Sequence, residues 1–340
     1  MKRITARSQN AALALNLVTN LQNQFVAGLE GIPAASKFEP IEWLRDNGAH
    51  GGGVRYVTTE GEIFNRASVN ISQVQYDDDE SKKLASATAL STIIHPQNPY
   101  APSVHMHFSW TEMKDGAGYW RVMADLNPSL LPCPQRDRFL DAIKCVAGDS
   151  FEEGIEQGNK YFYIPALERH RGVAHFYLEG YKTDNSEADY QFVKRFAEKM
   201  IETYMNILTE ILANAPEACE EDCGFQLAYH TLYLFQVLTL DRGTTSGLLV
   251  HDQNDVGIMG SIPARVNRVL LNSWADKVEA PQDALVRELV NVLPDPVTEV
   301  TEEIKKKLAS TVRAHYAAHP EALKLQARGN TVPPTVQNHK

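Results

Sequence analysis

The chain has 340 residues, of which 33 are Lys or Arg and 43 are Asp or Glu, so its formal net charge is −10 at pH 7. The composition, 43% hydrophobic and 22% charged, is that of an ordinary globular protein. The acidic balance argues against nucleic acid or an anionic membrane surface as the main partner. No apolar run approaches the roughly 18 residues of a membrane helix, so no membrane span is expected. Four cysteines are too few for a disulfide scaffold, which predicts a reducing compartment, taken as the cytoplasm.

The N-terminal segment has two interpretations. Its first 29 residues contain basic residues and no acidic ones, a composition typical of transit peptides. Apolar residues recur at helical spacing between Leu13 and Phe25, however, and no small-residue cleavage site follows. A helix is therefore favoured over a transit peptide.

Residues 51–181 have mostly the pattern of β-strands. Segments 53–59 and 63–74 flank a turn at Glu60-Gly61, which predicts a hairpin. Segments 104–110 and 119–126 flank Lys114-Asp-Gly-Ala-Gly118 and predict a second hairpin. Strict alternation in the strand 104–110 means that one of its faces is buried and the other is polar.

The rest of the chain predicts mainly helices. Apolar residues at helical spacing predict a long helix over 187–215, and two further helices are expected over 282–293 and 297–318. Residues 232–240 are interpreted as a strand that ends at Asp241-Arg-Gly-Thr244. Neither a repeat nor a linker divides the chain, so we predict one α+β domain over residues 1–325, with a large, mainly antiparallel sheet packed by helices. Residues 326–340, which have few large apolar side chains, are predicted to be a flexible tail.

Histidines are concentrated around a proline-rich loop between two predicted strands. His95 precedes the loop, while His105, His107 and Ser109 follow it and share one strand face by their period of two. An antiparallel return would bring His95 near that face. Three imidazoles there can bind a metal, move a proton or bind carboxylates, or they are simply hydrogen-bonded within a polar sheet face.

Other motifs give weaker signals. Gly51-Gly-Gly53 is followed by a strand pattern rather than Gly-Lys-Ser/Thr, so close backbone approach or a flexible lid is favoured over a phosphate loop. The spacing of Cys219 and Cys223 differs from the usual zinc motif. Asp241 and Arg242 either bind a substrate or brace a turn.

Seven separated segments, taken together, carry more information than any one of them. The most specific are His95-Pro-Gln-Asn-Pro-Tyr100 and Asp241-Arg-Gly-Thr244; the others are Gly51-Gly-Gly53, Ile63-Phe-Asn-Arg-Ala-Ser-Val-Asn-Ile-Ser-Gln-Val74, Ala124-Asp-Leu-Asn-Pro128, Tyr161-Phe-Tyr163 and Arg171-Gly172. In this order and at nearly this spacing, over roughly residues 10 to 275, they resemble the oxygen-dependent coproporphyrinogen III oxidase family.

The resemblance implies a fold, a reaction and partners. The family fold is a large antiparallel sheet with helices on both faces, assembled as a homodimer. The implied reaction is the oxidative decarboxylation of coproporphyrinogen III to protoporphyrinogen IX in haem biosynthesis. Dioxygen is the co-substrate, no organic cofactor is expected, and a divalent metal is left open. The alternative is a family-fold paralogue that binds or oxidises a different, less carboxylated substrate.

The resemblance also implies catalytic and metal-binding residues. His105 matches the proposed proton donor, and Asp241 and Arg242 match a pair at a strand end. His95 and His105 match two proposed metal ligands, whereas Leu140 and Ala166 stand near the positions of two further ligand histidines.

Implied substrate contacts are in part retained and in part replaced. Ser91 matches a contact, and His107-Phe-Ser109 falls where the family has Asn-x-Arg, so an arginine is missing at Ser109. Glu179 stands where the family has paired aspartates, and it is predicted to replace them. Arg55, Arg171 or His107 is expected to compensate for the missing cation.

Overall fold

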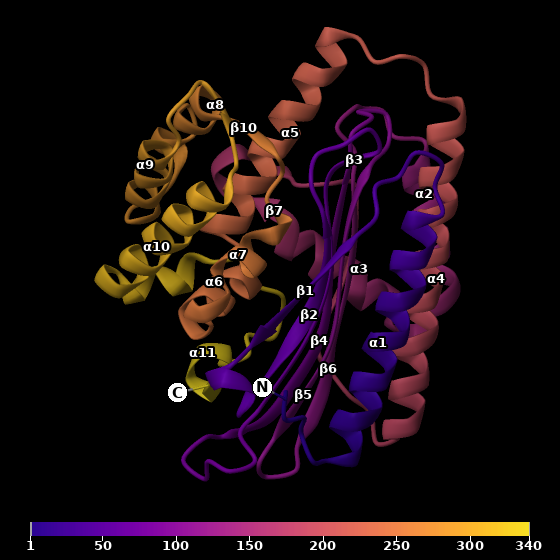
Figure 1. Cartoon of the computed structure of the whole chain (residues 1–340), viewed down its shortest axis with the longest axis vertical. Coiled ribbons are helices and arrows are strands. Elements are labelled where there is room, and N and C mark those ends of the chain that lie inside the picture. The colour runs from indigo at the N-terminus through magenta and orange to yellow at the C-terminus, as the bar shows by residue number, and fades with distance from the viewer. Residues whose placement is uncertain (1, 340) are drawn as a thin grey trace.

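Seven strands form one antiparallel sheet that separates two layers of helices in the computed structural model, which describes residues 2–339 (Figure 1). The strand order is β1-β2-β3-β4-β5-β6-β9. The strands are β1 (Glu39–Leu44), β2 (Gly51–Thr58), β3 (Phe64–Gln75), β4 (Leu84–Pro96), β5 (Ser103–Met113), β6 (Gly118–Asn127) and β9 (Ala174–Tyr181). Both predicted hairpins are confirmed, as β2–β3 and β5–β6. The α+β class predicted from the sequence is also confirmed.

The apolar face of the sheet is covered by the first helical layer. This layer contains α1 (Gln9–Glu30), α2 (Gln135–Ala147) and α4 (Ser186–Asn214), while α3 (Phe151–Phe162) packs against β9. The helices predicted at the N-terminus and over 187–215 are therefore confirmed. Phe192, Phe196 and Tyr204 of α4 are buried in the main core, as expected for an apolar helical stripe. The sequence pattern did not predict α2 and α3 individually.

The polar face of the sheet is covered by residues 220–339 (Figure 1). Its helices are α5 (Glu220–Thr239), α6 (Arg242–Val250), α7 (Asp255–Ile258), α8 (Arg268–Asn272), α9 (Gln282–Val292), α10 (Glu302–Ala318) and α11 (Thr335–His339). Short antiparallel pairs join β7 (Tyr163–Ile164) to β8 (Arg169–His170), and β10 (Arg265–Asn267) to β11 (Val297–Glu299). A second apolar core fills this layer.

The strand predicted over 232–240 is wrong, because residues 232–239 belong to α5 and Leu240 caps the end of this helix. Every residue from Tyr229 to Thr239 is buried, so apolar side chains surround the helix and leave no one-sided stripe. A short, continuous apolar run of this kind does not distinguish a buried strand from a buried helix. Asp241 consequently caps the start of α6 instead of ending a strand.

The two predicted C-terminal helices are confirmed as α9 and α10. The second begins later than predicted, because residues 297–299 form β11 and Thr301 caps α10. The hydroxyl of Thr301 accepts a hydrogen bond from the Ile304 amide over 3.3 Å, which satisfies one of the free amides of the first turn.

Residues 326–339, which the sequence predicts as part of a flexible tail, are packed against the helical layer. The Ala327 amide donates to the Leu240 carbonyl over 2.9 Å, and the Gln326 side chain donates to Thr245 and Tyr316. The segment ends in α11 beside α6. Hydrogen bonds to distant residues, which local composition does not reveal, hold it there.

Close backbone approach explains the glycines at the start of β2. A Cβ atom on Gly53 would lie 2.1 Å from the Ile71 carbonyl oxygen, and one on Gly51 would lie equally close to that of Gln73. Of the two readings left open for this segment, the structure therefore favours close approach between strands. None of the helices within residues 2–339 is long and apolar enough to cross a membrane.

Candidate active site

A cavity of about 280 Å³ lies between the polar face of the sheet and the second helical layer. Small side chains at alternate positions form its floor, namely Ser68, Ser72, Ala87, Ala89, Ser91 and Ser109. They share one face because β3, β4 and β5 pair in register, with Ser72 opposite Ala89 and Ala89 opposite Ser109. A floor of short side chains accommodates a flat ligand.

The sheet brings the predicted residues of β4 and β5 together in this cavity. Ser91 lies opposite His107, and His105, His107 and Ser109 all line the cavity. The predicted shared face is therefore confirmed. Burial, followed by the nearby Arg121, lowers the pKa of His107 well below its ordinary value, so this imidazole is neutral at physiological pH.

His105 is hydrogen-bonded to a carboxylate that the sequence analysis did not single out. Its Nδ1 lies 2.7 Å from Oδ1 of Asp125, the residue directly opposite on β6. Because a carboxylate only accepts hydrogen bonds, Nδ1 carries the proton, and Nε2 is then the nitrogen that can exchange a proton with a ligand. This His–Asp arrangement is typical of a positioned acid or base.

Asp125 itself is completely buried and is held by a second group. Its other oxygen accepts from Arg171 Nη2 at 2.8 Å and from Nδ2 of the Asn127 side chain at 2.6 Å. Burial alone would raise the pKa of Asp125, but the charges of Arg171 and His105 lower it below its ordinary value. Arg171 is fixed between the rings of Phe162 and Tyr233, 4.7 and 4.8 Å from their centroids. The carboxylate therefore stays ionised beside His105.

A second ion pair lies on the same face toward β9. Arg121 Nε donates to Glu179 Oε2 over 2.7 Å, and the Tyr177 hydroxyl donates to the same oxygen. Burial opposes the charge of Arg121, but Glu179 outweighs it and raises the pKa of the guanidinium. Glu179 Oε1 is buried and accepts no hydrogen bond within the described residues, which leaves an acceptor for an N–H donor of a ligand.

Asp241 and Arg242 line the cavity from the helical side. Asp241 Oδ2 accepts from the Thr244 amide at 2.6 Å and caps α6, while Oδ1 accepts from the Tyr161 hydroxyl at 2.7 Å. Arg242 donates to the Pro333 carbonyl over 2.9 Å, and no ion pair joins it to Asp241 within the described part of the chain. Asp241 thus braces a helix start and also faces the cavity.

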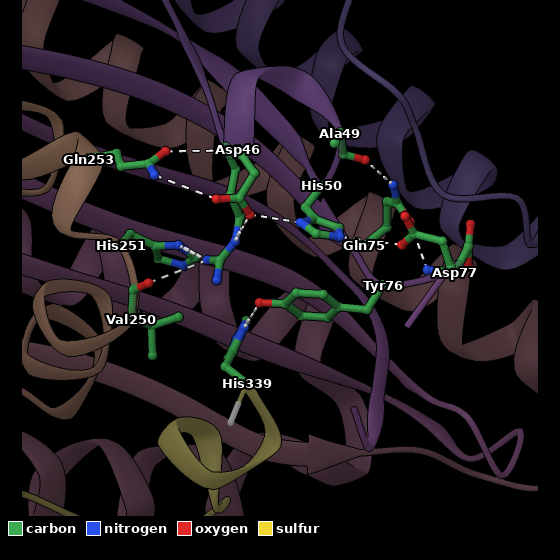
Figure 2. A network of polar contacts seen from close by, with 12 residues as sticks. Asp46, Ala49, His50, Gln75, Tyr76, Asp77, Val250, His251, Gln253 and His339 are labelled. Carbon is green, nitrogen blue, oxygen red and sulfur yellow. Dashed lines mark hydrogen bonds and ion pairs between the residues drawn. The ribbon is translucent and has the colours of Figure 1, made fainter. Parts of the chain in front are cut away.

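A network of polar contacts beside the cavity joins residues near the start of the chain to His339 near the C-terminus (Figure 2). His339 of α11 lines the cavity, and its Nδ1 lies 3.1 Å from the Tyr76 hydroxyl. Arg45 contacts the His251 ring and approaches Asp46 at 3.6 Å. Burial is the main cause that lowers the pKa of His251 to about 3 and that of His339 to about 4, and the positive charge of Arg45 is the second cause. Both imidazoles are therefore neutral at pH 7.

Two residues predicted for the site lie elsewhere. His95 is fully buried, with Nδ1 2.8 Å from the Ser103 hydroxyl and Nε2 3.2 Å from the Ser261 carbonyl. Arg55 donates to Asn254 over 3.0 Å and does not line the cavity.

Residues 14–297 match the sequence profile of the Coproporphyrinogen III oxidase family. The chain belongs to this family. An oxygen-dependent coproporphyrinogen-III oxidase of Coxiella burnetii is 29% identical over 79% of this chain and 92% of its own length. One from Prochlorococcus marinus is 27% identical over 91% and 97%, respectively. The mitochondrial enzyme of Rattus norvegicus is 25% identical over 82% of this chain and 67% of its own length. The family is one of oxidoreductases.

For a coproporphyrinogen III oxidase family member, the residues present do not fit the metal site suggested by the resemblance. Both ring nitrogens of His95 are used by protein oxygens, and Nδ1 of His105 is used by Asp125. The described residues contain no group of three or more His, Cys, Asp or Glu side chains arranged to hold a metal. His95 and His105 therefore do not form a joint metal site in this conformation.

Several residues of the site had no individual role predicted from the sequence. Arg121 and Asp125 lie on β6, where the alternation of residues 119–126 already indicates one polar face, so extending the period from the first strand of the hairpin would have found them. Tyr161 and Tyr177 gave no such signal, because they reach the cavity from a helix end and an edge strand. His251 and His339 depend on the packing of α6 and α11.

Proposed function

We propose that the protein catalyses the oxygen-dependent oxidative decarboxylation of coproporphyrinogen III to protoporphyrinogen IX. Each reacting propionate loses carbon dioxide and a hydride equivalent as it becomes a vinyl group. The four electrons released by two propionates reduce one dioxygen to two waters, so dioxygen is the co-substrate and no organic cofactor is required. Family membership supports the reaction class, and the cavity supports the substrate class.

The observation that carries the proposal is the His105–Asp125–Arg171 chain beside a flat polar floor. His105 Nδ1 is fixed by Asp125, which directs the opposite nitrogen to exchange a proton with the substrate or with reduced oxygen. We assign His105 this role, and Arg171 keeps Asp125 ionised.

The remaining predicted residues are assigned to substrate binding. Ser91, His107 and Ser109 lie on the cavity floor and contact the macrocycle. Glu179 Oε1 accepts a pyrrole N–H, which stabilises positive charge on the ring as electrons leave. Asp241 and Arg242 lie across the cavity from the sheet, and Arg242 is the cation available there for a propionate.

An anaerobic assay tests this function. Purified protein is mixed with coproporphyrinogen III without oxygen, air is admitted, and products are separated by chromatography while carbon dioxide and metal content are measured. We expect oxygen-dependent protoporphyrinogen IX and two carbon dioxides per product. His105→Ala should abolish turnover, whereas His319→Ala, which changes an exposed histidine, should not. Turnover by the His105→Ala variant at the normal rate would refute the assigned role.

The alternative, a family-fold paralogue for a less carboxylated substrate, is favoured by one observation. Ser109 supplies no cation, and Arg121 already carries a carboxylate partner. Tight binding of a dicarboxylate porphyrin, without turnover of coproporphyrinogen III, would establish this reading in place of the first.

We further propose a homodimer, which the family resemblance implies, and a cytoplasmic location. We also propose one domain over residues 1–325, against which residues 326–339 pack. All four cysteines are free thiols in the structure, which agrees with a reducing compartment. Sedimentation of the purified protein, at concentrations bracketing the micromolar range, tests the dimer.

A further inference from the structure

Arg121 and Ser109 are direct partners across the β5–β6 pair. Residues directly opposite in an antiparallel pair point to the same side of the sheet, with Cβ atoms roughly 5 Å apart. Both side chains line the cavity. A cation on Arg121 therefore occupies the part of the cavity next to Ser109, where the family resemblance expects an arginine.

The guanidinium of Arg121 has unused donors. Nε is bonded to Glu179, whereas the terminal nitrogens have no hydrogen-bond partner within the described residues. Nη1 lies 4.0 Å from the position of a Cβ atom on Gly243. Because Gly243 has no side chain, this residue of α6 does not cover the terminal edge of the guanidinium.

Glu179 fixes the direction of this guanidinium. Its side chain is 1% exposed and that of Arg121 is 19% exposed, so the arginine is the more accessible partner. The Tyr177 hydroxyl also bonds to Glu179 Oε2. Glu179 thus accepts two hydrogen bonds and orients the planar guanidinium of Arg121. In this orientation the guanidinium can bind a carboxylate through two parallel hydrogen bonds.

No other cation replaces Arg121 at this position among the described residues. His107, its neighbour on the floor, is neutral because burial lowers its pKa. Arg171 is committed to Asp125 deep in the sheet. Arg242 lies on the helical side and donates to Pro333.

We propose that Arg121 is a substrate-binding residue that clamps a propionate carboxylate at the β5–β6 side of the cavity. In this assignment the cation has moved from the position of Ser109 to its partner on the next strand. The inference rests on the proposed function, because it assigns one carboxylate of that substrate. Glu179 is the positioning residue for the clamp.

Binding of coproporphyrin III, the stable oxidised form of the substrate, tests the proposal by fluorescence quenching. The tetra-amide of the same porphyrin has the same ring without carboxylates and serves as the second probe. Arg121→Gln should weaken coproporphyrin III binding at least tenfold and leave the tetra-amide nearly unchanged, since only the former offers an anion to the guanidinium. Arg121→Lys should give an intermediate loss, because it keeps the charge but not the fork.

Loss of Arg121 alone leaves Glu179 buried and unpaired, so the protein must also be tested with the pair neutralised. The double variant Arg121→Gln/Glu179→Gln keeps two groups that can hydrogen-bond and removes both charges. Arg138→Gln/Glu210→Gln is the matched control, because this ion pair, 2.8 Å long, joins α2 to α4 away from the cavity. The exchange Ser109→Arg/Arg121→Ser should restore much of the lost affinity.

The outcomes separate the two proposals. If the unmodified protein binds neither porphyrin, both the proposed function and the proposed clamp are overturned. If the protein converts coproporphyrinogen III, but the double variant binds coproporphyrin III as tightly as the control, only the clamp is overturned. Equal losses of coproporphyrin III and tetra-amide binding in the Arg121→Gln variant would also overturn the clamp, because they would indicate a structural role.

Discussion

Asp125 lies directly opposite His105 on the neighbouring strand, and the two side chains meet at 2.7 Å between Oδ1 and Nδ1. Asp125 is also the buried partner of Arg171. The carboxylate of Asp125 therefore links the orientation of His105, the candidate proton-transfer residue, to the buried charge of Arg171.

Replacing Asp125 by Asn should reduce both activity and stability. We expect kcat to fall by on the order of a hundredfold or more, because the amide no longer fixes the imidazole tautomer. Arg171 would be left without its anion in the interior, which costs roughly 3 kcal/mol of the free energy of unfolding. Steady-state kinetics and urea denaturation measure the two effects. Asp137→Asn, at an exposed site, is the control, and an unchanged kcat for Asp125→Asn would contradict the prediction.

His95 should prove to be a structural residue. Its ring is fully buried against Tyr229, His230 and Tyr233, so His95→Ala leaves a void and two unpaired polar groups. We expect the free energy of unfolding to fall by about 2–4 kcal/mol, with the metal content of the purified protein the same as that of the unmodified protein. Elemental analysis beside urea denaturation checks this. Loss of a stoichiometric metal from a variant of normal stability would show that His95 is a ligand.

The free energy of unfolding should decrease as the pH falls below about 6.5. Burial lowers the pKa of His175 to about 4, from 6.5 for the ordinary group. Between these pH values the unfolded chain binds a proton that the folded chain does not. The free energy of unfolding therefore falls by up to about 1.4 kcal/mol for each unit by which the pH is lowered, for each such histidine. His339 behaves in the same direction. Urea denaturation from pH 7.5 to 4.5 measures the slope, which should be shallower in His175→Gln; an equal slope would contradict the assignment.

The α11 segment should limit ligand entry. Thr335, Asn338 and His339 form part of the cavity wall, and the Tyr76 hydroxyl contacts His339. Removing the chain from residue 335 onward should speed association of coproporphyrin III in stopped-flow fluorescence, because a side of the cavity is uncovered. Tyr76→Phe removes only the hydroxyl contact and should have a smaller effect. An unchanged association rate in the truncated protein would refute this role of α11.

Gly53 should be irreplaceable for a steric reason. A Cβ atom there would lie 2.1 Å from the Ile71 carbonyl oxygen and 2.6 Å from the Trp43 indole nitrogen, so Gly53→Ala must push apart strands on both sides. We expect a loss of several kcal/mol, comparable to severe overpacking. Gly224→Ala is the control: it lies in α5 with open space around the added methyl group, and it should be neutral or stabilising by up to about 1 kcal/mol. Equal thermal stability of the two variants would contradict the argument.

The sequence alone determined the features that follow from local periodicity. Alternation in residues 104–110 is sufficient to place His105, His107 and Ser109 on one face, because successive side chains of a strand point to opposite sides. The helical stripe along α4 likewise depends only on the 3.6-residue period. The order and spacing of the seven segments were sufficient to indicate the family, which the profile match to residues 14–297 confirms.

Tertiary packing decided the rest. Residues 232–239 are helical and buried on all sides, and a continuously buried run shows no one-sided periodicity that would distinguish a helix from a strand. Both ring nitrogens of His95 are taken up by Ser103, which lies across the loop, and by Ser261, which lies 166 residues further along the chain. The pairing of Arg121 with Glu179 and the folding of α11 onto the cavity also join distant segments. Local propensity carries no information about contacts of this kind, and they determine which charges face the cavity.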